Sequence, residues 1–139
     1  KLGALHPALF DAIEGANRQA ADEMVDLAKS FVAVRTGELR DSIVATPPGQ
    51  TTPAYSQGGG IAVPPGSYAV TAGNSKVRRA HLVEWGTKPH PQGGMFAGTQ
   101  HPGTAPQPYF WPAYRMIRKK MRGRLGRAIG KAVRAIAGK

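Results

Sequence analysis

Hydrophobic positions repeat with helical spacing at both ends of the chain. Between residues 5 and 34, apolar residues recur every three or four positions, which is the period of a helix with one buried face. Between residues 112 and 137 the same period returns, and the polar face there is almost entirely arginine and lysine. The pattern therefore predicts a long N-terminal helix over residues 5–35 and a basic C-terminal helix over residues 112–137.

The middle of the chain consists of short apolar runs separated by turn residues. The runs at residues 43–45, 61–63 and 68–72 are typical of strands, because they are bounded by proline, glycine and other turn residues. Residues 77–87 fit a helical turn or a strand. Short strands joined by turns favour an antiparallel sheet. With the two long helices, they predict one α+β domain over residues 1–139, in which the helices pack on a small antiparallel β-sheet.

A short helix is expected at the start of the middle region, residues 36–87. Gly37 is well placed to end the first long helix, because glycine accepts the left-handed conformation that often follows a helix. Thr36 is a good residue to cap the helix that follows. The region then continues into the predicted strands and a glycine-rich loop at residues 49–60.

Two further segments break the periodic pattern. Residues 88–105 carry three prolines and four glycines without apolar periodicity, which predicts a long irregular loop. Residues 106–114 combine four aromatic rings with three prolines. Because proline fixes φ and disfavours helix in the residue before it, this aromatic–proline segment is predicted to run extended. Phe110 and Trp111 would then point to opposite sides, until Pro112 opens the last helix.

The net charge of +11 is distributed unevenly. Seven of the eight acidic residues lie at or before Asp41, and ten lysines and arginines follow from Arg115 onward. Such asymmetry favours contact with nucleic acid, an acidic protein or a membrane surface. The absence of cysteine excludes disulfides and thiolate metal sites, and no apolar run approaches the ~20 residues of a membrane span.

The sequence gives little support to catalytic or metal chemistry. The four histidines match no metal-binding spacing, and the loop that holds His90 and His101 has no acidic residue. His81 lies near Glu84, but no nucleophile is marked beside them. The glycine run at residues 58–60 lacks the lysine and hydroxyl of a phosphate loop. We therefore expect no catalytic, metal or cofactor site, and we predict a binding protein rather than an enzyme.

The basic face of the C-terminal helix has three interpretations. It is an ordinary solvated face, a surface for DNA phosphates or another acidic partner, or, less in keeping with the sequence, a membrane-surface helix. No aromatic residue that could stack on bases follows Tyr114, so contact with nucleic acid would be non-specific. The candidate contacts on this face are Arg115, Arg118, Lys119, Arg122, Arg124, Arg127, Lys131 and Arg134.

Three motifs occur in a fixed order along the chain. Residues 36–43 read TGELRDSI, residues 80–87 read AHLVEWGT, and residues 105–113 read APQPYFWPA. In this order, and followed by a helix, they resemble the neck or tail-completion (head–tail joining, minor tail) proteins of long-tailed bacteriophages and related gene transfer agents. The resemblance covers roughly residues 5–134.

The resemblance implies a structural virion protein that assembles in the cytoplasm of a host bacterium. It implies a homo-oligomeric ring of six subunits in the neck, between the head-closure ring and the tail tube or its terminator. Double-stranded DNA would pass through the lumen without sequence-specific contact, and no membrane is involved. A tail-terminator ring is the alternative within the particle, and a small basic DNA-binding protein is the alternative outside it.

Roles for the motif residues follow from their chemistry. Leu39 and Ile43 are expected in the core, and Arg40 is expected to pair with Glu84, because an unpaired buried carboxylate is costly. Gly86 is expected to supply a turn that a Cβ atom disfavours. The loop over residues 88–104 is expected to reach a neighbouring subunit or ring and to become ordered there. The full set of structural and interface candidates is Leu39, Arg40, Ile43, Glu84, Trp85, Gly86, Pro108, Tyr109, Phe110, Trp111 and Pro112.

Overall fold

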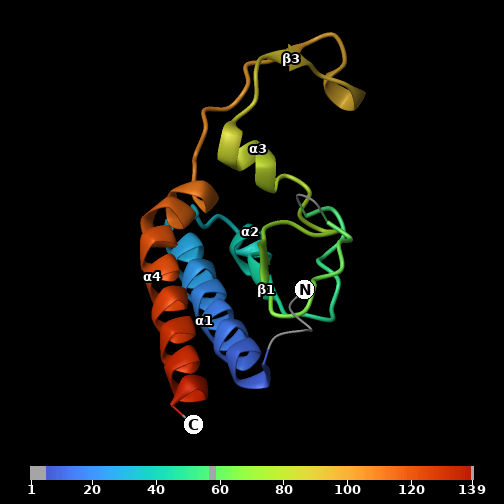
Figure 1. Cartoon of the computed structure of the whole chain (residues 1–139). Coiled ribbons are helices and arrows are strands. Elements are labelled where there is room, and N and C mark those ends of the chain that lie inside the picture. Colours follow the sequence, from blue (N-terminus) through green and yellow to red (C-terminus); the bar gives the residue numbers. More distant parts are fainter. Residues whose placement is uncertain (1–5, 57–58, 139) are drawn as a thin grey trace.

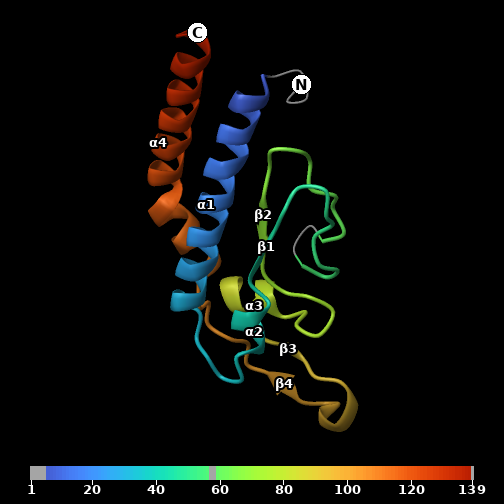
Figure 2. The ribbon, with the colours of Figure 1, turned by 90° about the horizontal axis from the view of Figure 1, so that it is seen from below.

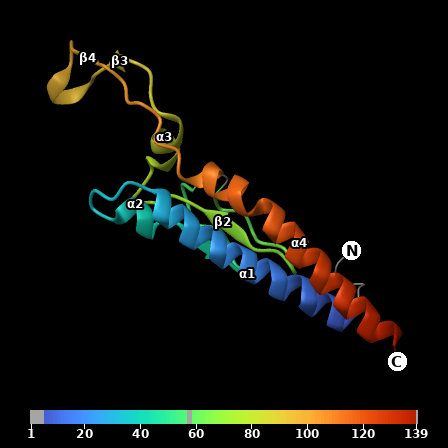
Figure 3. The ribbon, with the colours of Figure 1, turned by 90° about the vertical axis from the view of Figure 1, so that its left-hand side faces the viewer.

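Two long helices form the spine of the molecule. A computed structural model describes residues 6–56 and 59–138. Helix α1 spans Pro7–Phe31 and helix α4 spans Phe110–Ala137. The two lie side by side with opposite chain directions (Figures 1 and 3). The predicted α+β class, with two long helices packed on small antiparallel sheets, is confirmed.

Helix α1 is shorter than the predicted helix over residues 5–35. Pro7 occupies its first turn, and the His6 Nδ1 atom accepts a hydrogen bond from the Ala8 N–H at 3.1 Å. The helix ends at Phe31, where Val32 turns extended and becomes part of the core. Val34, the last apolar residue of the predicted helical repeat, is therefore exposed. Leu5, where the predicted periodicity begins, lies outside the described residues.

The β1–β2 sheet lies on the face of α1 that is turned away from α4 (Figure 2). Strand β1 spans Val44–Thr46 and strand β2 spans Ala69–Thr71, paired antiparallel with Val44 opposite Thr71. The run predicted as a strand at residues 61–63 forms no strand but a single bridge between Thr51 and Ala62. The sheet is therefore a minimal two-stranded ribbon that depends on the helices for its packing.

Two short helices complete the body. Helix α2 spans Glu38–Asp41, and its N-cap residue is Gly37, which adopts a left-handed conformation at φ 85°. Gly37 therefore starts α2 instead of ending α1, and the Thr36 hydroxyl accepts only a long hydrogen bond from the Glu38 N–H, at 3.4 Å. Helix α3 spans Ala80–Trp85, so the segment that fitted both helix and strand is helical. The core cluster draws on all these elements: Ala28, Val32, Leu39, Ile43, Ala72, Val77, Ala80, Tyr109 and Ala113.

The predicted long loop at residues 88–105 contains a small hairpin. Strands β3 (His90–Pro91) and β4 (Gln100–His101) pair antiparallel, and a 3₁₀ turn, η2, spans Gly94–Phe96 between them. The hairpin stands away from the helices at one end of the molecule (Figure 1). We call residues 88–104 the arm.

Helix α4 begins two residues earlier than the sequence predicts. Phe110 and Trp111 lie in its first turn, so the prediction that they alternate across an extended segment is wrong. Residues 105–109 have no regular secondary structure, and Pro112 occupies the third helical position. Tertiary contacts at the helix N-terminus, described below, start the helix ahead of the proline.

Candidate interaction site

The carboxylate of Glu84 binds the N-terminus of α4. Its Oε2 atom accepts hydrogen bonds from the backbone N–H groups of Tyr109 and Phe110, at 2.7 and 3.0 Å. Its Oε1 atom accepts one from the Trp111 N–H at 3.0 Å. The first four N–H groups of a helix have no partner within the helix, and the fourth position here is Pro112, which has no N–H. Glu84 therefore satisfies every such donor at this helix start.

This cap is also favourable in charge. A carboxylate at a helix N-terminus interacts with the positive end of the helix dipole. Glu84 is only 3% exposed, so little water competes with these hydrogen bonds. The second and third motifs are thus joined by one buried anionic side chain.

Tyr109 is the inward-facing ring of the aromatic–proline segment. It is 1% exposed, and its hydroxyl donates a hydrogen bond to the Ala80 carbonyl oxygen at 3.2 Å. Burial, with a smaller contribution from the Glu84 charge, raises the pKa of Tyr109 above its ordinary range. The phenol therefore stays protonated and remains a donor. Phe110 and Trp111 are half-buried and meet edge to face, with ring centroids 5.4 Å apart.

A second connection lies where α3 ends. The Gln107 N–H donates to the Val83 carbonyl oxygen at 2.8 Å. Gly86 follows α3 with φ 73° and ψ 179°, a conformation that is essentially restricted to glycine. A Cβ atom there would lie 2.5 Å from the Thr104 carbonyl oxygen. Glycine at this position lets the returning chain pass directly against α3.

The predicted pair between Arg40 and Glu84 is wrong. Arg40 lies near its neighbour Asp41, with 3.3 Å between its Nε atom and the Asp41 Oδ1 atom, and both side chains are exposed. No ion pair joins Arg40 to Glu84 within the part of the chain that the structure describes. The physical reason is that three backbone N–H groups already surround the Glu84 carboxylate. The expectation that a buried acid needs partners was sound, but those partners are backbone groups.

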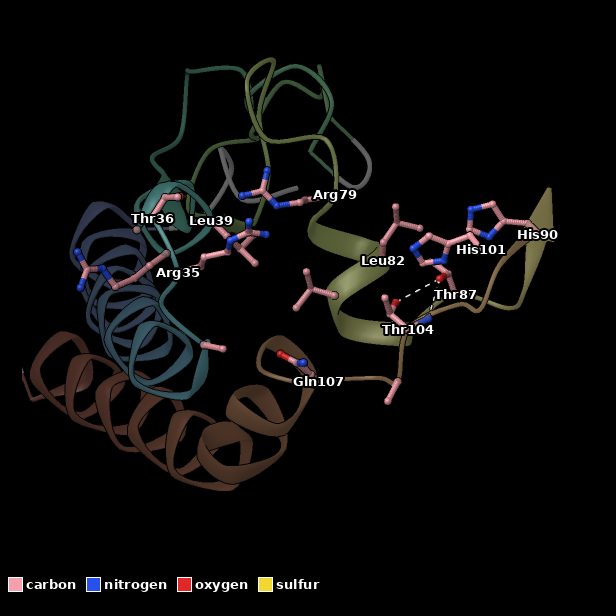
Figure 4. A pocket seen from close by; sticks show the side chains of 15 residues that line it. Arg35, Thr36, Leu39, Arg79, Leu82, Thr87, His90, His101, Thr104 and Gln107 are labelled. Carbon is pink, nitrogen blue, oxygen red and sulfur yellow. Dashed lines mark hydrogen bonds between the residues drawn. The ribbon is translucent and has the colours of Figure 1, made fainter. Parts of the chain in front are cut away.

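A groove of about 490 Å³ lies where the first motif, the second motif and the base of the arm meet. Leu39 and Arg79 lie on one side of it, and His90 and His101 on the other, with α3 between them (Figure 4). The full lining is Ala33, Arg35, Thr36, Gly37, Leu39, Arg40, Arg79, Leu82, Val83, Thr87, His90, His101, Thr104, Ala105 and Gln107. The groove is therefore apolar inside, with three arginines among the residues that line it.

The basic face of α4 is largely open to solvent. Of the eight predicted contacts, seven are exposed, and Arg124 is the exception. The guanidinium of Arg124 binds both carboxylate oxygens of Glu23 on α1, at 2.8 and 2.9 Å. Lys120 lies 3.5 Å from the same carboxylate. Arg124 therefore links the two long helices through an ion pair and is not part of the open basic face.

The ion pair with Arg124 changes the pKa of Glu23. The hydrogen bond from Arg124 is the main reason that the pKa of Glu23 is lowered, and the charges of Arg124 and Lys120 act in the same direction. Burial opposes these effects. The pair therefore favours the ionised carboxylate and fixes the relative position of α1 and α4.

Sequence reasoning did not single out Ser42 within the first motif. Its hydroxyl donates to the Leu39 carbonyl oxygen at 2.6 Å and accepts from the Gly73 N–H at 3.0 Å. It is 3% exposed and ties α2 to the turn after β2. The sequence did contain one signal for this role, because Ser42 is a small hydroxyl residue next to Ile43, which was predicted to lie in the core.

Trp85 is 59% exposed and Pro108 is exposed, so both remain open to contact with a partner.

The described residues do not form a metal site. Among residues 6–56 and 59–138, no three His, Asp or Glu side chains gather closely enough to hold a metal ion. In the same ranges, no helix has the length and hydrophobicity to cross a membrane.

The family comparison agrees with the resemblance of the motifs. Residues 1–86 match the family of bacteriophage HK97-gp10, which is described as a tail component. The match covers more than half of the 139 residues and includes the first motif and nearly all of the second. The chain therefore belongs to the HK97-gp10-like family. It is a phage tail component, and its location is the virion. Neither the curated proteins nor the solved structures contain a significant match.

Proposed function

We propose that this tail component forms a closed ring of six subunits in the neck or upper tail. The ring joins the head connector to the tail tube and surrounds the path of the DNA. Its activity is binding rather than catalysis. The proposal rests on family membership, on the order of the three motifs, and on the surfaces that a single copy leaves uncovered.

The observation that carries the proposal is the apolar surface at one end of the molecule. Leu82 and Trp85 on α3 are 42% and 59% exposed, and Met95 and Phe96 on the arm are 93% and 59% exposed. Large exposed apolar patches are unusual on monomeric proteins and mark sites of association. These four residues belong to one stretch of chain, from α3 to the arm. A closed ring would cover such a surface on every copy.

The charge distribution supports a subunit whose two sides differ. Exposed arginines and lysines line α4, while all acidic residues lie at or before Glu84. Cyclic rings are built from heterologous contacts, in which one surface of a subunit meets a different surface of the next. The open basic face of α4 is the surface that we assign to the DNA path, because Lys and Arg neutralise phosphates without reading sequence.

The test is to measure the mass and shape of the purified full-length chain. Light scattering over a range of concentrations should give a species of six subunits, and electron microscopy of that species should give rings with a central hole. A chain that stays monomeric at the highest attainable concentration, in both low and high salt, would contradict a self-assembling ring. Electron microscopy of labelled particles would then separate the neck position from the alternative of a tail terminator.

A second candidate function is non-specific DNA binding by a single copy. The seven exposed basic residues on α4 favour it. Binding to random duplex DNA would fall with salt, with a slope of about −0.9 for each phosphate neutralised. Strong binding by the monomer, with a slope corresponding to several phosphates and without ring formation, would favour this function over the neck ring.

A further inference from the structure

The arm is an ordered hairpin with an apolar tip. The rings of His90 and His101 stack across its two strands, with centroids 4.8 Å apart. At its base, the Thr87 and Thr104 backbones exchange two hydrogen bonds of 3.0 Å. Further out, the Gln92 N–H donates to the Thr99 carbonyl oxygen at 2.9 Å. These contacts hold the 3₁₀ turn, η2, at the end of the hairpin.

Two large apolar side chains are displayed at that end. Met95 and Phe96 are adjacent in η2, and Met95 has the highest exposure of the large hydrophobic residues described, at 93%. Residues 88–100 are all exposed except Gln92, which is half-buried. The body therefore gives the tip almost no cover. A preorganised hairpin that presents apolar side chains to water is suited to enter a complementary site.

The groove described above has matching chemistry. Its interior is formed by Leu39, Leu82 and Val83, with Ala33 and Ala105 beside them. Its volume of about 490 Å³ lies within the range of sites that bury small apolar groups. The same molecule's tip is not placed to fill it, because the base of the arm forms one wall and the arm leads away from there (Figures 1 and 4).

Charge selects the tip among the exposed apolar groups of the chain. Arg35, Arg40 and Arg79 line the groove, so a basic segment would be repelled. The segment from Gln92 to Gln100 has no charged residue, whereas the exposed Met116 on α4 lies between basic residues. The tip can therefore approach the arginines without like-charge repulsion.

We propose that the Met95–Phe96 tip of one copy inserts into the Leu39–Leu82–Val83 groove of the next copy. This inference rests on the proposed ring. Each copy has one tip and one groove at different places, so the contact is heterologous and repeats around a closed ring until every tip and groove is occupied. It assigns a partner to the arm and to the exposed Leu82 of α3 together.

A cross-linking experiment tests the contact directly. The chain has no cysteine, so introduced pairs are the only thiols. Met95→Cys combined with Leu82→Cys should give disulfide-linked oligomers under mild oxidation, because the two Cα atoms must come within about 7 Å to form the bond. The matched control is Met116→Cys combined with Leu82→Cys, since Met116 is also exposed but lies on α4. Cross-linking of the control as efficient as that of the tip pair overturns the proposal.

Mixing two defective variants tests the direction of the contact. Met95→Ser with Phe96→Ser removes the apolar tip, and Leu82→Asp spoils the groove; each variant alone should raise the concentration needed for assembly by at least about tenfold. Mixed in equal amounts, the intact tip of one variant meets the intact groove of the other. A one-to-one dimer that grows no further is expected, because the second tip and the second groove are both defective. Circular dichroism of each variant establishes that it is folded.

The outcomes separate this contact from the ring itself. Wild-type rings without a specific tip–groove cross-link would overturn the contact and leave the ring intact. A wild-type monomer without the cross-link would overturn both. Full rings formed by either variant at wild-type concentrations would show that the tip or the groove plays no part in assembly.

Discussion

Replacing Glu84 with glutamine removes the charge from the buried cap of α4 and leaves its shape nearly unchanged. In the wild type, one carboxylate oxygen accepts from two N–H groups and the other from one. Glutamine can keep a carbonyl oxygen for the first two donors, but its amide then faces the Trp111 N–H with another donor. At least one buried N–H group loses its partner.

The expected cost can be worked from these contacts. A buried donor left unpaired costs about 1–3 kcal/mol, and a lost charge at a helix N-terminus costs about 0.3–1 kcal/mol more. The other two hydrogen bonds weaken as their acceptor becomes neutral. We expect E84Q to lower the free energy of unfolding by about 2–4 kcal/mol. With a urea m-value of about 2 kcal/mol/M, the midpoint would fall by about 1–2 M.

The assay is urea denaturation at a concentration where the chain is monomeric, followed by tryptophan fluorescence and circular dichroism. Glu38→Gln is the matched control, because Glu38 is exposed and lies 3.7 Å from Arg79 in a surface ion pair. Its effect should stay within about 0.5 kcal/mol. If E84Q were as stable as E38Q, the argument that Glu84 holds the start of α4 would be refuted.

Three further substitutions test the other contacts between segments of the chain. Gly86→Ala should destabilise the protein by about 2–3 kcal/mol, because φ 73° with ψ 179° excludes a Cβ atom. The control is Gly126→Ala in α4, which has open space around it and should stabilise by up to about 1 kcal/mol. Equal effects of the two substitutions in urea denaturation would contradict the role of Gly86. Because the pKa of Glu23 is lowered from 4.5, its pair with Arg124 stabilises above about pH 5 and loses this effect as the pH falls through the lowered pKa. The difference between wild type and E23Q should then be about 1 kcal/mol at pH 7 and shrink as the pH falls below 4.5, and a difference that is independent of pH would refute this. Tyr109→Phe should cost about 1 kcal/mol through the lost hydrogen bond to Ala80, measured in the same way, and no loss would mean that this bond contributes nothing.

Much of the fold could be predicted because it depends on local chemistry. The period of apolar residues located α1 and α4, since a helix that buries one face must repeat apolar positions every three to four residues. Leu39 and Ile43 were expected in the core because they are the apolar residues of the first motif, and both are buried. The proline and glycine content located the arm. It did not reveal that the arm forms a hairpin, in which the rings of His90 and His101 stack across the two strands.

The candidate site was less accessible to sequence reasoning because its contacts join distant segments. Glu84 was correctly expected to need partners, yet those partners are backbone N–H groups 25 to 27 residues away. Backbone donors carry no sequence signal, so an arginine was the natural but wrong choice. Arg124 looked like part of a uniform basic face, and only the packing of α4 against α1 distinguishes it from its neighbours.

The sequence by itself determined the two helices, the α+β class, the charge asymmetry and the phage tail family, because these depend on local periodicity, composition and ordered motifs. The tertiary structure alone decided that the second and third motifs meet at one buried carboxylate, that Tyr109 faces inward, and that an apolar groove lies beside the base of an arm with an apolar tip. The physical reason is that caps, ion pairs and grooves arise from the approach of segments far apart in the chain. Their geometry exists only once the helices have packed.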